Sequence, residues 1–563
     1  MKKIPYGISD FKALREQGYL YVDKTQFIEK LENLGEKYIF FLRPRRFGKS
    51  LFISLLHHYY DKNAESYYDT IFPGTYIYDH PTPGKNAYYV LNFNFSGINT
   101  STQERCLEGF AEKIILGLKK FESYYNLKLA YKTTGLPSDI LGSFLVETSA
   151  HLQGKIYVLI DEYDHFANEL LSFKTEIFED VISKTGFVRK WFEVLKEGTE
   201  TIIDRIFATG VTPVTLDSLT SGFNIARNKS RDQQFNECLG FTEEEVLFLF
   251  NELFGENFAN DSLLPILKNY YNGYLFCEYS HTRLFNSDMV LYYLSEYILY
   301  NRPPSDMIDS NISSDYSKIQ NLFNLKNKSQ NLSVLEELVN QSQTLCTITR
   351  EFSFAVNFSS DDFKSLLFYM GLLTIKEAAR PLILGFPNYV MKELYFDYFG
   401  KLIKDQTEFQ LETSALQAAI FQIADQGKID LFITIIENIL ERLSKRDYIK
   451  FDEKYVKVII FTLFMMSKIY YVKSEYEVEG GFIDIALLRR VNVPVTYPAI
   501  FEIKYIKKSD SDTNPELQAQ KMQEAKAQIL KYTTAEELKS EKNLKKFCIV
   551  VTGHQCQVEE IVN

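Results

Sequence analysis

The chain of 563 residues lacks the features of disulfide-stapled, secreted and membrane-spanning proteins. Its six cysteines are scattered and form no Cys-x-x-Cys pair, so neither disulfides nor a zinc site are expected. The first residues contain no apolar stretch of signal-peptide length. The longest apolar run of interest, residues 458–466, is far too short to cross a bilayer. We therefore expect a cytoplasmic protein without a membrane partner.

The chain also lacks an excess of basic residues, an internal repeat and heptads long enough for a coiled coil. It has 63 Lys and Arg against 74 Asp and Glu, a formal net charge of −11. This balance argues against a globally basic nucleic-acid binder, although a local basic groove remains compatible with it. A hydrophobic content of 45% and a charged content of 24% are ordinary for a soluble globular protein. The length predicts three or four domains.

Residues 38–50 predict a buried strand, a tight turn and the start of a helix. The stretch ends in Gly48, Lys49 and Ser50, which fit the phosphate-binding pattern G-x-x-x-x-G-K-[ST], while Arg43 stands at the position of the first glycine. Backbone N–H groups around Gly48 can cradle phosphate at a helix N-terminus. Lys49 would reach the β- and γ-phosphates, and the Ser50 hydroxyl would contact Mg²⁺. The alternative is a chance Gly-Lys-Ser after an apolar run.

A second stretch, residues 155–164, is an apolar run that ends in carboxylates. Such a run predicts a parallel strand buried on both faces, and ligands of open α/β sheets bind at the carboxyl ends of strands. Asp161 is therefore placed to hold Mg²⁺, directly or through water, and Glu162 to polarise the attacking water. The alternative is a strand that ends in a solvated acidic turn.

These motifs resemble a bacterial family of AAA-ATPase-like proteins. Residues 43–51 (RPRRFGKSL) are similar to the signature loop of that family, and further similar motifs are found at 21–25, 209–212, 240–245 and 271–274. An arginine at the first glycine position is usual there. The resemblance implies ATP and Mg²⁺ as ligands. We expect the nucleotide site to contain Arg46, Phe47, Gly48, Lys49, Ser50, Leu51, Asp161 and Thr209.

Residues 38–215 alternate between strands and helices, which predicts a parallel sheet with right-handed crossovers. The expected strands are 38–42, 88–95, 156–160 and 205–209, and the expected helices include 49–60 and about 102–118. The strand at 88–95 comes between the loop strand and the Asp161 strand. An inserted strand, with Glu162 beside the Mg²⁺ aspartate, suits by fold analogy the ATPase branch that uses an additional glutamate.

Two further assignments in this region stay open. Thr209 or Thr212 could sense the γ-phosphate, or a hydroxyl there could simply satisfy a turn. Arg205, Arg227 and Arg231 are candidates for a transition-state arginine, which can be worth about 10³ to 10⁵ in rate, and solvated charge is the alternative for each.

The fold class expected for the whole chain is α/β in four parts. Residues 1–239 form a P-loop ATPase domain, in which 1–37 are a helical cap whose Asp23-Lys24-Thr25 either approaches the nucleotide or only caps the structure. Residues 240–332 form a helical lid and connector, because Thr242 to Glu245 has capping-box spacing. Residues 333–409 read as helix, strand, turn and strand, which suits either a winged-helix-like docking module or a plain packing domain. Residues 410–563 form a restriction-endonuclease-like α/β domain with a helical lead-in.

The last part holds a second group of charged residues within apolar strands. A side-chain period of two places Glu502 and Lys504 on one face of a strand, and Asp484 lies between Ile483 and Ile485 in the preceding strand. Charged groups inside apolar strands are costly to bury unpaired. A metal ion shared by Asp484 and Glu502, with Lys504 beside it, would remove that cost.

This order resembles the D…E-x-K core of the PD-(D/E)XK nucleases. The resemblance implies that Asp484 and Glu502 are metal ligands and that Lys504 orients the attacking water or stabilises phosphorane charge. Glu453, just before the apolar helix expected at 455–466, resembles the extra helix carboxylate of many members. Gln528 and Tyr532 resemble a Q-x-x-x-Y motif, whereas Phe482-Ile483 departs from the Arg that relatives often carry. The alternative is an inherited nuclease fold with ion pairs and no activity.

We therefore expect an ATPase with a C-terminal Mg²⁺-dependent nuclease-like domain, in which ATP controls the access of DNA or RNA to the second site. A transition-state arginine supplied in trans would make the protein a homo-oligomer. Two other functions remain open. One is a nucleotide-driven switch that binds a protein partner and uses the nuclease fold as a scaffold. The other is a nucleotide-binding regulator that does not hydrolyse ATP.

Overall fold

The computed structural model describes residues 2–173, 177–178, 181, 186–213, 223–255, 260–317, 322–323, 327–350, 352, 358–407, 412–443, 452–514, 516–532, 535–539 and 541–562. The chain divides into two compact units. The N-terminal unit comprises Met1–Asn301, Asp306–Val334 and Gln343–Val390, and the C-terminal unit comprises Arg302–Ser305, Leu335–Ser342 and Met391–Asn563. The boundary expected at residue 409 lies outside the described residues. Among the described helices, none is long and apolar enough to cross a membrane.

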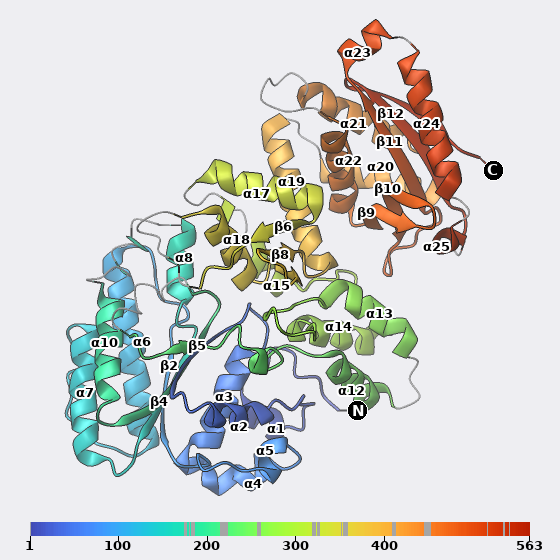
Figure 1. The fold of residues 1–563 in the computed structure, drawn as a ribbon. Helices are drawn as coiled ribbons and strands as arrows, with labels where there is room; N and C mark the ends of the chain where they lie inside the picture. Colours follow the sequence, from blue (N-terminus) through green and yellow to red (C-terminus); the bar gives the residue numbers. More distant parts are fainter. Residues whose placement is uncertain are drawn as a thin grey trace. The chain divides into compact units, whose positions relative to one another are not determined.

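The N-terminal unit is built on a five-stranded sheet, as the alternating pattern predicted (Figure 1). The paired strands run parallel to one another in the order β2-β3-β4-β1-β5. All six residues of β3 are buried, which explains its unbroken apolar run. The strands are β1 Tyr38–Leu42, β2 Tyr89–Asn94, β3 Ile156–Asp161, β4 Ile203–Gly210 and β5 Arg227–Asn228.

An additional strand does separate β1 from β3 in this sheet, but it is β4. The sequence-based interpretation gave that role to residues 88–95, which instead form β2 at the outer edge beside β3. The interpretation was wrong about the strand because the order of strands along the chain does not fix their order in a sheet.

Helices cover both faces of the sheet. In Figure 1, α6, α7 and α10 lie on one side of the sheet and α3 lies on the other. The helices of this part are α1 Phe11–Glu16, α2 Gln26–Asn33, α3 Lys49–Tyr60, η1 Lys62–Tyr67, α4 Tyr68–Ile71, α5 Tyr76–Asp79, α6 Gln103–Tyr124, α7 Pro137–His151, α8 His165–Phe173, α10 Phe187–Gly198 and η2 Gln233–Phe235.

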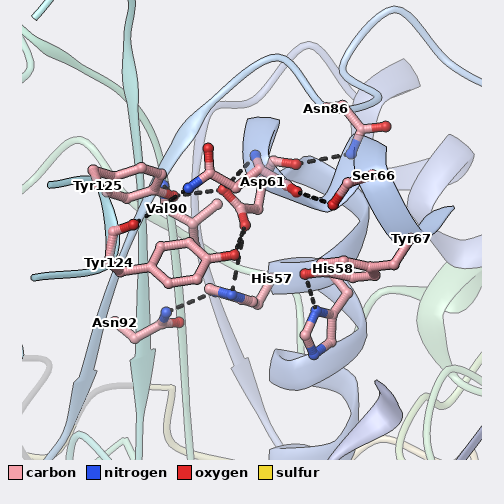
Figure 2. Close-up of polar contacts among 11 residues, drawn as sticks. His57, His58, Asp61, Ser66, Tyr67, Asn86, Val90, Asn92, Tyr124 and Tyr125 are labelled. Carbon is pink, nitrogen blue, oxygen red and sulfur yellow. Dashed lines mark hydrogen bonds and ion pairs between the residues drawn. The ribbon is translucent and has the colours of Figure 1, made fainter. Parts of the chain in front are cut away.

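A buried carboxylate fixes the far end of α3 (Figure 2). Asp61 is fully buried and follows the last residue of the helix. It accepts hydrogen bonds from the hydroxyls of Tyr124 at 2.5 Å and Tyr125 at 2.6 Å. The Tyr125 hydroxyl also accepts a hydrogen bond from the backbone N–H of Val90 at 2.8 Å. The end of α3 is therefore tied to the end of α6 and to β2, which holds the helix in place against the sheet.

A helix begins where the capping-box spacing predicted it. Thr242 and Glu245 form a complete capping box at its start. The helices that follow are α12 Glu243–Phe254, α13 Asn260–Tyr271, α14 Ser287–Tyr300, α15 Ser310–Ser317 and α17 Lys328–Gln341.

The helix, strand, turn and strand expected in residues 333–409 are found, with one more strand than expected. The sheet has the order β6-β8-β7, and both pairs are antiparallel. The sequence reading anticipated β7 and β8 but not β6, a short strand in which alternate residues are exposed. The elements are β6 Gln343–Cys346, α18 Ser360–Tyr369, β7 Thr374–Glu377, β8 Leu382–Gly385 and α19 Tyr389–Thr407.

The C-terminal unit contains a mixed sheet of order β13-β12-β11-β10-β9. Among the strand pairs that the structure describes in it, β11–β12 is parallel and the others are antiparallel. Helix α24 packs on β10, β11 and β12, and α22 packs on β9 and β11. The strands are β9 Tyr470–Val478, β10 Gly481–Arg489, β11 Ala499–Ile506, β12 Lys545–Thr552 and β13 Gln555–Glu560. The helices are α20 Thr413–Gln426, α21 Asp430–Leu443, α22 Glu453–Ser467, α23 Lys508–Thr513, α24 Leu517–Tyr532 and α25 Glu536–Lys539.

Candidate functional site

The glycine-lysine-serine loop connects β1 to the N-terminus of α3. Gly48 has a φ of 90°, a left-handed conformation that glycine adopts without strain. Lys49 is buried, and its Nζ donates to the backbone carbonyls of Arg43 at 3.1 Å and Pro44 at 2.9 Å. Burial lowers the pKa of Lys49. The loop thus places an ammonium group and the free N–H groups of a helix N-terminus together, which is an arrangement that binds phosphate.

The arginine at the first glycine position does not enter the phosphate cradle. The guanidinium of Arg43 is buried and donates to four backbone carbonyls, at 2.7 to 3.2 Å, which belong to Leu42, Ser230, Phe235 and Asn236. It also lies 4.4 Å from the ring centre of Phe41 and 4.2 Å from that of Phe276. Burial lowers the pKa of Arg43 to about 9, so the group stays charged at neutral pH. The departure from the general loop is therefore a structural crosslink.

Ser50 and Asp161, the two residues expected to bind Mg²⁺ in this unit, contact each other. Ser50 Oγ donates to Asp161 Oδ2 at 2.7 Å, and Asn94 Nδ2 approaches the same oxygen at 3.4 Å. Asp161 Oδ1 is buried without a hydrogen-bond donor among the described residues. Burial raises the pKa of Asp161. A hydroxyl beside a buried carboxylate with one unsatisfied oxygen fits Mg²⁺, which prefers oxygen ligands and needs few of them from protein.

Glu162 follows β3 in a strained conformation. Its φ of 52° is left-handed, which is uncommon for a residue other than glycine and costs about 1 to 3 kcal/mol. Glu162 lines the cavity over the loop, and its Oε2 lies 4.0 Å from His165 Nε2. Strain of this kind is often found at functional sites.

The loop lines a cavity of about 490 Å³. Of the residues expected in the nucleotide site, Arg46, Phe47, Gly48, Lys49, Ser50 and Leu51 line it. Apolar side chains also line the cavity, among them Ile8, Leu20, Val22, Leu239, Phe241, Leu249 and Leu291. A phosphate-binding loop together with apolar walls suits a nucleotide, in which an anionic chain is joined to a flat base.

The threonine and arginine candidates lie elsewhere. Thr209 Oγ1 donates to the Phe41 carbonyl at 2.7 Å, and Thr212 contacts the buried carboxylate of Asp164. Arg205, near the start of β4, is 4.0 Å from Asp204, and Arg231 pairs with Glu278 at 2.9 Å. Arg227 is exposed on β5. None of these residues lines the cavity, whereas Arg45 and Arg46 do.

The cap motif has a mixed role. Asp23 and Thr25 accept hydrogen bonds from the backbone N–H groups of Tyr76 and Ile77, which is a structural function. Lys24 lines the cavity, and its Nζ lies 2.6 Å and 2.7 Å from the two carboxylate oxygens of Glu245.

One lid contact was missed from the sequence. Asp288 lies in the first turn of α14, and its Oδ2 is 3.5 Å from Arg46 Nη1. The N-terminus of that helix also donates to the loop, because the Ser287 hydroxyl is 3.2 Å from the Arg46 carbonyl. Residues 241 positions apart in sequence give no local signal of such a contact.

The C-terminal site brings Asp484, Glu502 and Lys504 together. Asp484 on β10 and Glu502 on β11 are both buried, and their strands are neighbours. Lys504 Nζ donates to Glu502 Oε1 at 2.9 Å, as expected for two residues on one strand face. The backbone N–H of Ile503 donates to Asp484 Oδ2 at 2.7 Å. Glu502 Oε2 is buried without a donor among the described residues.

A residue that the sequence-based analysis missed pairs with Asp484. Lys457 Nζ lies 2.6 Å from Asp484 Oδ1 and 3.0 Å from Glu453 Oε1. Lys457 is one helical turn after Glu453 on α22, so an i, i+4 pair was visible in the sequence. A cavity of about 280 Å³ opens beside these residues, and Glu475 and Asn340 also line it.

The electrostatics of this site follow from burial and from the crowding of carboxylates. Burial and the neighbouring Asp484 raise the pKa of Glu502 to about 7. Burial also raises the pKa of Glu475 and, with Glu502 and Asp484 nearby, that of Tyr532. Gln528 Oε1 is buried without a donor among the described residues. The described part of the chain contains no group of three His, Cys, Asp or Glu arranged to hold a metal, so the fit rests on two carboxylates, which suffice for Mg²⁺ in many sites.

The two units define an α/β P-loop domain followed by a restriction-endonuclease-like α/β domain. Comparison with protein families confirms this architecture: residues 5–220 match the family described as "Predicted AAA-ATPase", and residues 451–561 match the PD-(D/E)XK nuclease superfamily. A curated relative, an uncharacterized protein in the vnfD 5' region of Azotobacter chroococcum mcd 1, is 30% identical over 250 residues. That match covers 44% of this chain and 45% of the relative, so it spans less than half the length of either protein.

Proposed function

We propose that the protein binds and hydrolyses ATP at the loop of the N-terminal unit. The observation that carries this proposal is the direct contact of Ser50 with Asp161, next to a cavity of about 490 Å³ that Ser50 and the buried Lys49 line. Mg²⁺ bound there would neutralise phosphate charge. Lys49 would bind the β- and γ-phosphates, and Glu162 at the cavity wall would orient the attacking water and accept its proton.

Two substitutions test this activity by phosphate release and nucleotide binding. Lys49→Ala should abolish ATP binding, because the charge contact to the phosphates is lost. Glu162→Gln should keep binding and lose turnover, because only water activation changes. Lys119→Ala on the exposed face of α6 is the matched control and should behave as the unmodified protein does. Equal hydrolysis by all four proteins would refute the proposal.

The C-terminal unit extends the proposal to Mg²⁺-dependent cleavage of DNA or RNA. Asp484 and Glu502 would hold the cation, which lowers the pKa of its bound water when present. Lys504 would place positive charge where the transition state gathers negative charge, and loss of such a group costs on the order of 10²-fold or more in rate. Glu453 on α22 lies beside this site, with its Oε1 3.0 Å from Lys457 Nζ. ATP binding or hydrolysis would control the access of the nucleic acid to this site.

Metal-dependent cleavage is the test of the second activity. The purified chain with Mg²⁺ or Mn²⁺ and ATP should cut nucleic acid, and EDTA should stop the reaction. Asp484→Ala, Glu502→Ala and Lys504→Ala should each abolish cleavage and leave ATP hydrolysis largely intact. Wild-type cleavage by Asp484→Ala, or no cleavage across a broad panel of substrates, would refute a nuclease function.

A second candidate function is supported by one specific observation. Lys457 already neutralises Asp484 within the protein, so the nuclease fold is compatible with a scaffold that holds no cation. The protein would then be a nucleotide-driven switch for a protein partner. ATP hydrolysis without any metal-dependent cleavage would favour this function.

The assembly state belongs to the same proposal. No arginine other than Arg45 and Arg46 lines the described nucleotide cavity. If a transition-state arginine comes from a second copy, the ATPase rate per chain should rise with protein concentration. A flat specific activity across a wide dilution series would leave the arginine in cis or absent.

A further inference from the structure

Two carboxylates of the C-terminal site contact the ammonium group of a lysine. Lys457 Nζ lies between Asp484 Oδ1 at 2.6 Å and Glu453 Oε1 at 3.0 Å. The side chain of Lys457 is only 20% exposed, and that of Asp484 only 7%. Its ammonium therefore stands between a helix carboxylate and a strand carboxylate, and it contacts the Asp484 oxygen that a divalent cation bound to Asp484 and Glu502 would compete for.

The pairing of charges around this lysine is uneven. Glu502 has a lysine of its own, because Lys504 Nζ contacts its Oε1 at 2.9 Å. Asp484 and Glu453 share Lys457. Glu453 is more exposed than Asp484, with 41% of its side chain accessible against 7%, so water compensates the charge of Glu453 better than that of Asp484. The positive charge of Lys457 therefore stabilises the buried Asp484 carboxylate more than the more exposed Glu453 carboxylate.

The surroundings contain acceptors that no protein donor satisfies. Glu502 Oε2 and Asn340 Oδ1 are buried without a hydrogen-bond partner among the described residues. Asn340 lines the same cavity as Lys457 and Asp484. Lone pairs of buried oxygens are usually satisfied, and a hydrated divalent cation supplies both positive charge and water donors.

We propose that Lys457 is a displaceable counterion of the metal site. Without a divalent cation it neutralises Asp484, and on metal binding its ammonium turns to Glu453 and gives up the Asp484 oxygen. With or without the divalent cation, Asp484 and Glu453 would then each have a positive charge nearby. The Lys457 ammonium needs to move only between two carboxylates that it already contacts. This inference rests on the proposed metal site, and it assigns to Glu453 the role of receiving the lysine.

The expected consequence is weak metal binding in the unmodified chain. A lysine in contact with a ligand oxygen opposes an incoming divalent cation through like-charge repulsion, which is strong at the few-ångström separations of a partly buried site. Removing that charge should tighten Mn²⁺ binding by about tenfold to a hundredfold. The exchange therefore sets the cation concentration at which the site becomes loaded.

The test is Mn²⁺ binding by the full chain, followed by electron paramagnetic resonance of free Mn²⁺. Asp484→Asn defines the background from other sites, including the Ser50–Asp161 site. Lys457→Met should bind Mn²⁺ more tightly than the unmodified chain, and Lys457→Arg, which keeps the charge, should not. The control Lys521→Met removes the same charge from the surface pair with Glu524, 2.6 Å long on α24, and should change nothing.

Thermal unfolding is the second readout and needs no activity. Without a divalent cation, Lys457→Met should unfold at a lower temperature than the unmodified chain, because Asp484 is left buried and unpaired. Saturating Mn²⁺ should remove the difference. If Lys457→Met binds Mn²⁺ no more tightly than the unmodified chain, the inference is overturned while the metal site stands. If neither protein binds above the Asp484→Asn background, the metal site itself is refuted.

A double-mutant cycle separates the receiving role of Glu453 from direct metal ligation. When Lys457 is present, Glu453→Gln should weaken Mn²⁺ binding, because Lys457 then has no carboxylate to pair with other than Asp484. In the Lys457→Met background the same change should have no effect. If Glu453→Gln weakens Mn²⁺ binding equally with Lys457 and with Lys457→Met, Glu453 is a metal ligand and its assigned role is overturned.

Discussion

Replacing Arg43 with glycine restores the general phosphate-loop pattern and should nevertheless damage the protein. In a loop where arginine is merely tolerated, Arg43→Gly would be harmless or would improve nucleotide binding. The structure predicts the opposite, because the guanidinium of Arg43 crosslinks the end of β1 to the segment around residues 230–236.

The size of the loss follows from the contacts of this side chain. Four buried carbonyls receive hydrogen bonds from it, and an acceptor left unsatisfied costs about 1 to 3 kcal/mol. Two aromatic rings lie within 4.4 Å of it, and each such contact is worth about 0.5 to 2 kcal/mol. Allowing some carbonyls to find water, Arg43→Gly should destabilise the N-terminal unit by about 4 kcal/mol or more. That loss is a large part of the stability of a typical domain.

Urea unfolding followed by far-ultraviolet circular dichroism measures the effect. The midpoint of the N-terminal transition should fall by roughly 1 to 2 M, and ATP binding should weaken with it. Arg43→Lys keeps the charge but reaches fewer carbonyls, so its urea midpoint should lie between those of Arg43→Gly and the unmodified protein. Arg105→Ala removes an exposed arginine that contacts Glu108 at 3.1 Å and should shift the midpoint little. An unchanged midpoint in Arg43→Gly, with equal or tighter ATP binding, would refute this reasoning.

Two predictions concern pH. Burial, with His57 nearby, lowers the pKa of His58 to about 3, so the unfolded chain binds more protons between about pH 6.5 and 3 and stability must fall as the pH drops below 6.5. His58→Gln should flatten this decline between pH 6.5 and 5 in urea midpoints, and an unchanged slope would contradict the assignment. The pKa of Glu502 is instead raised, to about 7. Without divalent cations the C-terminal unit should therefore lose stability as the pH rises from about 4.5 to 7. Glu502→Gln should remove this loss of stability. If the variant loses as much stability as the unmodified protein over the same pH range, the raised pKa of Glu502 is not its cause.

The parts of the fold that the sequence predicted are those with a strong local signal. The runs at residues 38–42 and 156–160 are continuously apolar because β1 and β3 are buried on both faces. Thr242 and Glu245 satisfy each other's backbone N–H groups, so the start of α12 is encoded within four residues. Both carboxylate sites were also visible, because an acidic residue within or at the end of an apolar strand is costly without a partner.

The parts that could not be predicted depend on contacts between distant residues. The position of β4 between β1 and β3 is a property of the sheet and not of any one strand. The direction of the Arg43 side chain is set by carbonyls about 190 positions further along the chain. Lys457 could have been paired with Glu453 by helical spacing, but its closer partner Asp484 is 27 positions away on a strand. Short elements such as β5, with two residues, carry too little pattern to be recognised.

The two buried aspartates show why similar sequence signals produce different sites. Asp161 receives the Ser50 hydroxyl on one oxygen and has no donor for the other among the described residues. Asp484 has both oxygens occupied, by Lys457 and by the backbone N–H of Ile503. A cation at Asp161 would fill an unsatisfied position, whereas a cation at Asp484 would have to replace a contact that already neutralises the charge. The first site would therefore gain more from Mg²⁺ at a given concentration than the second, and we predict that the N-terminal unit is loaded before the C-terminal unit as Mg²⁺ rises.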